Sequence, residues 1–471
     1  MTVANNYDWR NKMLKAELGK ETATRLITEQ AELIRLYSLY DGPGQMWDTK
    51  SGLDYVPTKR ITNNIKYLIK EVARFMLSRA PEITIQPVGD KESNAEKCAA
   101  LEEFVRRTLQ DSRFPGSLVK AGRDQLIGKR VALKVSGGPG KPLRVGFRPA
   151  IETWADWDPE DASRLTKLIY LYQSTEAETE ADQRWWYQIY RLKAGKATVE
   201  EHVVDGRGYA VERRMDETTL PIPYIPSCVL INDGLTGDTM GESEAAQLEQ
   251  LAEAYNRMTS DDQDALRFNM FPQTVVRDAS QESLASIKVA PKAIIDLQTD
   301  PARMDGQADA RVLESGFSYS ERMEKLLERL DLDMRKMLGV PPKGLDEYKS
   351  SGISGKALKA LYWPLITKCE EKWAEWDTAL TWMVNCLYDL AVAYNQADGF
   401  AGAEYTVGIE HLYPLTDDEE EERALDLREV GQGARSIKSY LDKWRPHADA
   451  EEEIQQIVRE KRMLEEQYGA M

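Results

Sequence analysis

The chain has 471 residues, of which 42% are hydrophobic and 8% aromatic, enough to bury cores in about two to four domains. Its formal charge of -17 argues against an outer surface that binds nucleic acid tightly, because such binding needs clustered Lys and Arg facing phosphates. The first thirty residues are polar and mixed in charge, and the most apolar long segment, residues 379–394, is too short for a bilayer. We therefore expect a soluble, intracellular protein with no membrane segment.

The first 230 residues predict a mixed α/β region. Helices are expected over much of residues 12–40 and over 65–78, 94–110 and 115–128, with Asn63 and Asn64 as candidate caps of the second. A short strand, ITIQPV, follows Pro81, and RVALKVS with LRVGFRP predicts a hairpin around GGPGKP. Four further β-rich segments between residues 166 and 214 predict an antiparallel sheet, in which Trp185, Trp186, Tyr187 and Tyr190 serve packing.

The middle of the chain predicts two long helices separated by a small β unit. The first helix runs from Glu242 to about Asn269 and ends at Phe271-Pro272, and the second runs from Tyr319 to Leu338. The first carries an apolar stripe, expected to be buried: Leu248, Leu251, Ala252, Tyr255, Met258, Ala265 and Leu266. Its other face is acidic and expected to be solvated: Glu242, Glu244, Glu249, Glu253 and Asp264.

A Gly/Ser loop, KGLDEYKSSGISGK, connects the second helix to a third long helix that begins near Ala357. A short strand and turn, EYTVGIEHLYPL, then precede an acid-headed helix, DDEEEERALDLREVGQG. Two more helices, 436–444 and 450–467, complete the prediction. The fold class is therefore α+β.

Motifs for catalysis or cofactor binding fail on their spacing. His202, His411 and His447 have no metal-ligand spacing, and neither SGGPGKPL nor SGISGKAL satisfies the phosphate-loop pattern. The four cysteines, expected to be buried and reduced, also lack CxxC spacing: Cys98, Cys228, Cys369 and Cys386. The segment WADWDPED supplies four carboxylates that could bind a cation, although an exposed turn is the favoured interpretation: Asp156, Asp158, Glu160 and Asp161. We expect no catalytic residue, cofactor or bound metal.

The order of these segments resembles the portal protein of long-tailed (siphovirus-type) double-stranded DNA bacteriophages. The resemblance covers nearly the whole chain and rests on the NNI helix with PEITI, AGRDQLIGKRVALKV and WADWDPED. It continues through INDGLTGDTMGESEAAQLEQLAEAYNRMTSDDQDAL, LGVPPKGL, the SSGISGKAL loop and a tail ending in EEEIQQIVREK. The family implies a ring of about twelve subunits through which DNA enters and leaves the capsid.

The resemblance implies five regions. An α/β wing would comprise residues 1–240 and 356–415, and a two-helix stem 241–270 with 315–340. A small α/β clip would span 271–314, a tunnel loop 341–355, and a helical crown 416–471. Gly355-Lys356 departs from the family pattern and leaves the length of the tunnel loop open.

The same resemblance implies three sets of functional residues. DNA would pass near the tunnel loop at Lys343, Gly344, Asp346, Glu347, Tyr348, Lys349, Ser351, Gly352 and Ser354. The stem would face the channel with Glu249, Glu253, Asp261, Asp264, Glu324 and Glu328. The clip would dock partners through Arg277, Asp278, Glu282, Lys288 and Lys292.

A portal would perform no chemistry itself and would bind many partners. These would be other copies of the chain, double-stranded DNA held weakly, the large terminase subunit, a head-completion (adaptor) protein, and the major capsid protein with its scaffold. Because the chain is acidic, surplus carboxylates in the channel would repel phosphate and let DNA slide. The protein would assemble in the host cytoplasm and end at the capsid portal vertex of the virion.

Two other functions remain open from the sequence. One is a ring-forming scaffold or coat-associated protein that has no DNA channel. The other is a divalent-dependent nucleic-acid-processing enzyme that uses the WADWDPED carboxylates.

Overall fold

The computed structural model describes residues 8–48, 55–89, 91–161, 163–270, 273–277, 299, 309–313, 319–344, 355–415, 419–444, 451, 453–456 and 458–459. Contacts divide the chain into two compact units. The first is Met1–Val340 with Thr367–Leu412, and the second is Pro341–Ile366 with Tyr413–Met471. Among the described residues, no helix is both long and apolar enough to cross a membrane.

Helices form the beginning of the first unit. Gly19, with φ of 81°, separates α1 (Asp8–Leu18) from α2 (Lys20–Asp41), and a single 3-10 turn, η1 (Pro43–Gln45), follows. The side chain of Asn63 accepts a hydrogen bond from Lys66 N and caps α3 (Asn64–Leu77), as predicted. The apolar face expected of α3 is buried: Ile65, Leu68, Ile69, Val72 and Met76.

Two small sheets follow in the first unit, with α4 (Glu92–Asp111) and α5 (Phe114–Gly128) between their first strands. The predicted hairpin of β2 (Arg130–Gly138) and β3 (Lys141–Pro149) is confirmed, and β9 (Ser227–Ile231) joins it in the order β3-β2-β9. The strand β1 (Glu82–Pro87) pairs antiparallel with β12 (Tyr405–Glu410), more than 300 residues later.

A five-stranded antiparallel sheet confirms the β-rich prediction. The chain passes through η2 (Ala150–Glu152) and enters the sheet, in which neighbours in space are neighbours in sequence. The strands are β4 (Thr153–Trp157), β5 (Leu165–Thr175), β6 (Arg184–Lys193), β7 (Lys196–Val204) and β8 (Ala210–Thr219).

Alternate residues of these strands enter two different cores. Trp185 and Tyr187 pack with Leu14 and Leu26 of the first two helices, whereas Tyr190 packs on the other face of the sheet. The period of two explains this division, since successive strand side chains point to opposite faces. Trp185, Tyr187 and Tyr190 thus serve packing, as predicted, whereas Trp186 is half-buried and stacks on Tyr172.

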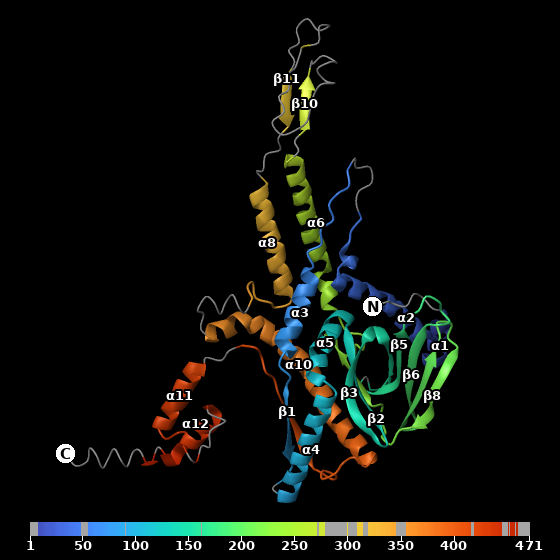
Figure 1. Ribbon diagram of the computed structural model, residues 1–471, viewed down its shortest axis with the longest axis vertical. Coiled ribbons are helices and arrows are strands. Elements are labelled where there is room, and N and C mark those ends of the chain that lie inside the picture. The colour runs from blue at the N-terminus through green and yellow to red at the C-terminus, as the bar shows by residue number, and fades with distance from the viewer. Residues whose placement is uncertain are drawn as a thin grey trace, which may run out of the picture. The chain divides into compact units, whose positions relative to one another are not determined.

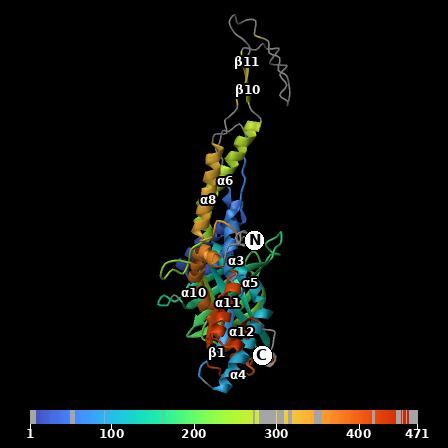
Figure 2. The ribbon, with the colours of Figure 1, turned by 90° about the vertical axis from the view of Figure 1, so that its left-hand side faces the viewer.

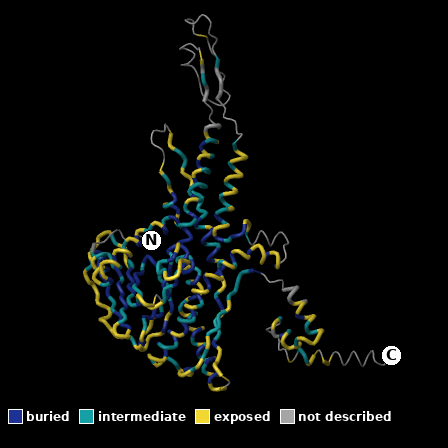
Figure 3. The backbone as a smooth tube through the Cα atoms, turned by 180° about the vertical axis from the view of Figure 1, so that it is seen from behind, coloured by how far each residue is buried: buried dark blue, intermediate teal, exposed yellow. Residues whose placement is uncertain are grey.

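Two long helices lie side by side in both ribbon views, α6 (Glu244–Met270) and α8 (Ser320–Met337) (Figures 1 and 2). Between them in sequence, β10 (Gln273–Arg277) and β11 (Asp309–Leu313) form the small antiparallel unit that was predicted. Figure 3 shows that most of α8 is exposed, and Met334 is its one fully buried residue. We refer to α6 and α8 as the stem helices.

The longest helix, α10 (Gly355–Ala393), begins two residues before its predicted start. Gly355 and Lys356 are therefore the first two residues of this helix. In the part within the first unit, Trp373, Trp376 and Leu380 are buried. Cys98, Cys369 and Cys386 are buried free thiols as expected, but Cys228 is only half-buried.

The second unit contains the N-terminal part of α10, with α11 (Glu419–Gly431) and α12 (Ile437–Trp444). One buried carboxylate, Asp426, joins the last two helices. It accepts hydrogen bonds from Arg435 at 2.5 Å, Lys443 at 2.9 Å and the indole N–H of Trp444 at 2.8 Å. The helix expected over 450–467 lies mostly outside the described residues.

Candidate functional site in the stem helices

A single row of side chains at every fourth position is buried along α6. The row comprises Glu244, Leu248, Ala252, Asn256, Ser260 and Asp264, each at most 6% exposed. Positions four apart form one ridge that is inclined to the helix axis and advances by about 40° at each step, so the covered strip winds around α6 over about five turns. Beyond the apolar Leu248 and Ala252 the ridge is polar, and the half formed by Asn256, Ser260 and Asp264 therefore needs polar partners.

The partner of the polar half is an extended segment, residues 55–62, which we call the strap. Thr62 N donates to Asn256 Oδ1 at 2.8 Å, and Arg60 N donates to Ser260 Oγ at 3.0 Å. Thr58 donates twice to Asp264, from its N–H at 2.8 Å and from its hydroxyl at 2.6 Å. The strap runs beside α6 in Figure 1.

The spacing of this ladder follows from elementary geometry. Four helical residues rise about 6 Å, and two extended residues rise about 6.6 Å, so the two repeats stay nearly in register. Alternate N–H groups of the strap point to the same side and meet side chains of α6 in turn. The ladder thus supplies the strap with the hydrogen bonds that a neighbouring strand would otherwise provide.

The other end of the ridge is a buried ionic cluster. Lys372 Nζ lies 2.9 Å from Glu244 Oε1, 2.7 Å from Asn232 Oδ1 and 3.1 Å from Asp233 Oδ2, and Lys368 also pairs with Glu244 at 2.9 Å. Burial alone would raise the pKa of Asp233, but the Lys372 ammonium outweighs it and holds that pKa below its ordinary value. The cluster joins the start of α6 to α10.

The loop before α6 explains one part of the INDGLTGDTMGES motif. Gly241 has φ of 74°, and a Cβ added there would lie 2.5 Å from the carbonyl oxygen of Lys129. A side chain at this position would therefore be both strained and obstructed. Ser243 then donates to the carbonyl of Ile127 at 2.7 Å, which ties the entry of α6 to the end of α5.

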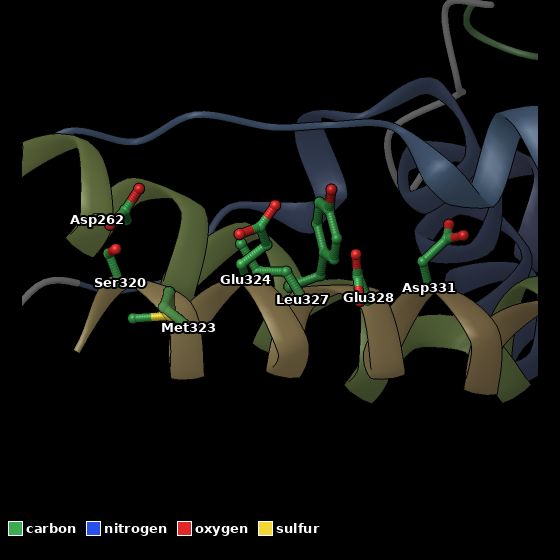
Figure 4. A pocket seen from close by; sticks show the side chains of 8 residues that line it. Asp262, Ser320, Met323, Glu324, Leu327, Glu328 and Asp331 are labelled. Atoms are coloured by element: carbon green, nitrogen blue, oxygen red, sulfur yellow. The ribbon is translucent and has the colours of Figure 1, made fainter. Parts of the chain in front are cut away.

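An open groove of about 540 Å³ lies between the stem helices (Figure 4). Tyr255, Met323 and Leu327 give it apolar surface, with Ser320 at one end. Its rim carries four carboxylates. Asp262 comes from α6, and Glu324, Glu328 and Asp331 lie along α8. Arg335 donates to Asp331 at 2.7 Å, so the negative charge is least balanced around Glu324 and Glu328.

The carboxylates predicted for the stem do not share one surface. Glu249 pairs with Arg35 at 2.6 Å and Glu253 with Arg257 at 2.6 Å, whereas Asp261 is exposed. Glu324 and Glu328 are brought together in the groove.

Two acidic positions are corrected. The prediction that Asp264 faces a channel is wrong, because its carboxylate is 6% exposed and bonded to the strap. Glu244, predicted on the solvated face, is buried beside two lysines. Sequence reasoning also missed Asn256 and Ser260, whose partners are backbone atoms about 200 residues away.

Most residues predicted for the clip and the tunnel loop fall outside the described part. In the clip, Arg277 is exposed at the end of β10, and Asp278, Glu282, Lys288 and Lys292 are not among the described residues. Lys343 is exposed and Gly344 half-buried. The remaining loop residues lie outside: Asp346, Glu347, Tyr348, Lys349, Ser351, Gly352 and Ser354.

The carboxylates of WADWDPED do not converge on one point. Asp158 accepts the N–H of Glu160, and Asp161 accepts the N–H and the hydroxyl of Ser163, so each caps its own turn. Hydrogen bonds from Ser163 also hold the pKa of Asp161 below its ordinary value. Within the described ranges, no group of three or more metal-ligating side chains comes together.

Two histidines serve as partners of carboxylates. His202 Nε2 lies 2.7 Å from Glu200 Oε1, and His411 Nε2 lies 2.9 Å from Asp377 Oδ1. The His411 ring also stacks on Trp373 with centroids 4.2 Å apart. These contacts account for both rings as parts of the packing; His447 lies outside the described residues.

Comparison with known proteins places the chain in a family. None of the curated proteins searched matches it. A solved structure of the "Neck of empty GTA particle computed with C6 symmetry" aligns with a TM-score of 0.42 and 15% identity, covering 80% of this chain and 87% of that one. A second, "Virion of native gene transfer agent (GTA) particle", aligns with a TM-score of 0.43 and 13% identity, covering 83% and 95%. The family model for "Phage portal protein, SPP1 Gp6-like" matches residues 20–467, and the chain belongs to that family of phage portal proteins.

Proposed function

We propose that this portal protein assembles into a ring of about twelve copies at one capsid vertex, and that double-stranded DNA enters and leaves through the ring. The observation that carries the proposal is the family match over residues 20–467, which includes every helix and strand described above except α1. Two adjacent stem helices that are separated in sequence by a β-hairpin are consistent with a subunit that contributes one segment of a channel wall.

Each of the regions expected from the sequence has its own role in the ring. Residues 1–240 and 356–415 form the wing, 241–270 and 315–340 the stem, and 416–471 the crown. The clip, 271–314, docks the large terminase subunit during packaging and a head-completion protein afterwards. The wing and crown contact the major capsid protein and its scaffold. Assembly takes place in the host cytoplasm, and the ring then stays at the portal vertex of the virion.

Weak contact with DNA fits the charge of the chain. A formal charge of -17 in each subunit gives the ring a surplus of carboxylates, which repel phosphates and favour sliding over capture. Glu253 and Asp261 are the α6 carboxylates from the predicted set that remain accessible for this role without a long-range ion pair. Lys343 and Lys349 on the tunnel loop give the few attractive, salt-screened contacts.

Native mass spectrometry of the purified full chain, followed by electron microscopy of the same sample, tests the proposal. We expect closed rings of about a dozen subunits with a central hole wide enough for a DNA duplex. Rings that lack a hole would support the scaffold alternative. A chain that stays monomeric across protein concentration, salt and crowding agents, and that does not restore packaging to a portal-deficient phage of the same family, would refute it.

A further inference from the structure

The exposed surface of α8 carries its charges in two separate stripes. Acidic side chains occupy one stripe, at spacings of three and four: Glu321, Glu324, Glu328 and Asp331. Basic side chains dominate another, which also holds Asp333 at its edge, and they too recur at helical spacing: Arg322, Lys325, Arg329 and Lys336. At 3.6 residues per turn, the centres of the two stripes lie roughly 110–120° apart around the helix.

The basic stripe is open to solvent. Lys325 is 70% exposed, Arg329 79% and Lys336 76%, and the ion pairs that they make within the described part of the chain are with neighbours one turn away on α8 itself. Such pairs on a helix surface are weak and readily exchanged for others. Leu332, 38% exposed, lies beside the stripe and adds apolar surface to it.

The groove described above has the complementary chemistry. Its acidic rim suits guanidinium and ammonium groups, while Tyr255, Met323 and Leu327 suit the aliphatic stems of Arg and Lys. The basic stripe of the same chain cannot enter this groove, because α8 is rigid and its residues that line the groove and its basic residues point in different directions. Another molecule must supply the basic surface, and a second copy of this chain carries one at the matching level of the stem.

We propose that the basic stripe of α8 in one subunit packs into the α6–α8 groove of the next. The contact is heterologous, because two different surfaces of the chain meet, and a heterologous contact repeated with rotation closes into a ring. The inference rests on the proposed ring and names the residues that join its subunits. Lys325 and Arg329 are the central donors, and Glu324 and Glu328 the central acceptors.

Two charge-reversal variants and their mixture test the contact. The variant K325E/R329E makes both surfaces acidic, and E324K/E328K makes both basic. Each alone should lose ring assembly in native mass spectrometry by about tenfold or more, since reversal replaces attraction with repulsion. Mixing the two in equal amounts should restore rings in which the variants alternate, because an acidic surface then meets a basic one at every interface.

A control separates this contact from the effect of net charge. K91E/R107E changes the charge by the same amount as K325E/R329E, on exposed positions at and within α4, and should assemble like the wild type. Circular dichroism should show native helix content in all variants, since the substituted side chains are exposed.

The outcomes distinguish the interface from the ring itself. Wild-type rings together with normal rings from both reversal variants would overturn this interface and leave the proposed function standing. Loss of assembly without rescue in the mixture would overturn it as well, because a true pairing must be restored by the complementary change. A wild-type chain that never forms rings would instead refute the proposed function. If K325E/R329E forms normal rings that package DNA poorly, the basic stripe faces DNA and the interface is wrong.

Discussion

The ladder between α6 and the strap makes a quantitative prediction for Asp264. Its carboxylate accepts the N–H and the hydroxyl of Thr58 at 2.8 and 2.6 Å, and D264A removes both hydrogen bonds. Hydrogen bonds to a charged acceptor contribute about 1.5–3 kcal/mol each, and less where water replaces the lost partner. Because Thr58 is half-buried, we expect D264A to lower the free energy of opening the strap by about 2 kcal/mol, or roughly 30-fold in the opening equilibrium.

Hydrogen exchange measured by mass spectrometry reads this equilibrium directly at the strap amides. Exchange of the Thr58 amide should accelerate most, and that of Thr62 least, because Asn256 and Ser260 still hold the far end. The isosteric D264N keeps one acceptor oxygen and should give a smaller acceleration.

The matched control is D261A, which removes the same side chain three residues earlier from the exposed side of α6. It should leave strap exchange unchanged. Equal acceleration in D261A and D264A would mean that helix stability, and not the ladder, protects the strap. Unchanged exchange in D264A would show that the Asp264 hydrogen bonds contribute nothing.

Three further predictions concern other sites. Burial and the nearby carboxylate of Glu152 raise the pKa of Asp124 to about 6, although a hydrogen bond from Tyr37 opposes the shift, so between about pH 4 and 6 the folded protein holds a proton that the unfolded chain has lost. The stability that this proton contributes is fully present below about pH 4 and is lost as pH rises through 6. In calorimetry, the wild type should therefore lose about 2 kcal/mol of unfolding free energy relative to D124N over that window. Arg130 and Glu29 form a buried bidentate pair at 2.5 and 2.7 Å, so E29A should lower the free energy of unfolding by about 3–5 kcal/mol, because it leaves the charge of Arg130 uncompensated. The double variant E29M/R130M should recover most of that loss in the same melting experiment, and a double variant in which the two losses add would contradict this. K343A/K349A should lower DNA retention in filled particles by roughly two- to five-fold, more at low salt than at high salt; unchanged packaging and retention would remove these lysines from the DNA path.

Local pattern predicted much of the fold. The apolar face of α3 and its Asn63 cap could be predicted because the spacing of apolar residues lies within the helix and the capping residue lies directly before it. The five-stranded sheet was evident for a similar reason, since alternation and intervening turns mark each strand. Both signals lie within a dozen residues of where they act.

In the stem helices, local sequence patterns predicted only part of what is buried. Hydrophobic periodicity predicted the buried Leu248 and Ala252, but it also included Leu266, which is 43% exposed. It passed over Asn256 and Ser260, because burial by a backbone partner leaves no apolar signature. The residues of the buried ridge recur at every fourth position from Glu244 to Asp264, and this spacing was the signal available in the sequence. The sequence did not reveal that the strap covers the polar half of the ridge.

The groove combines predicted and unpredicted residues. Glu324 and Glu328 were singled out for their charge, but Asp262 and Asp331 entered only when the two stem helices were placed together. Asp331 follows Glu324 by seven residues, as Asp262 follows Tyr255, so a heptad relation links the members on each helix. Pairing of helices about 70 residues apart is a tertiary property that one-dimensional spacing does not specify.

The fourfold ridge of α6 also limits how its length can change. Inserting one residue between Ala252 and Asn256 would turn the rest of the helix by about 100° and carry its three polar side chains away from the strap. Insertions of seven or eleven residues leave a phase error of only about 20°, and lengthen the helix by about 10 or 16 Å. The strap would need roughly three or five added residues to follow. Natural relatives with longer stems should therefore differ from this chain in paired, phase-preserving steps in α6 and the strap.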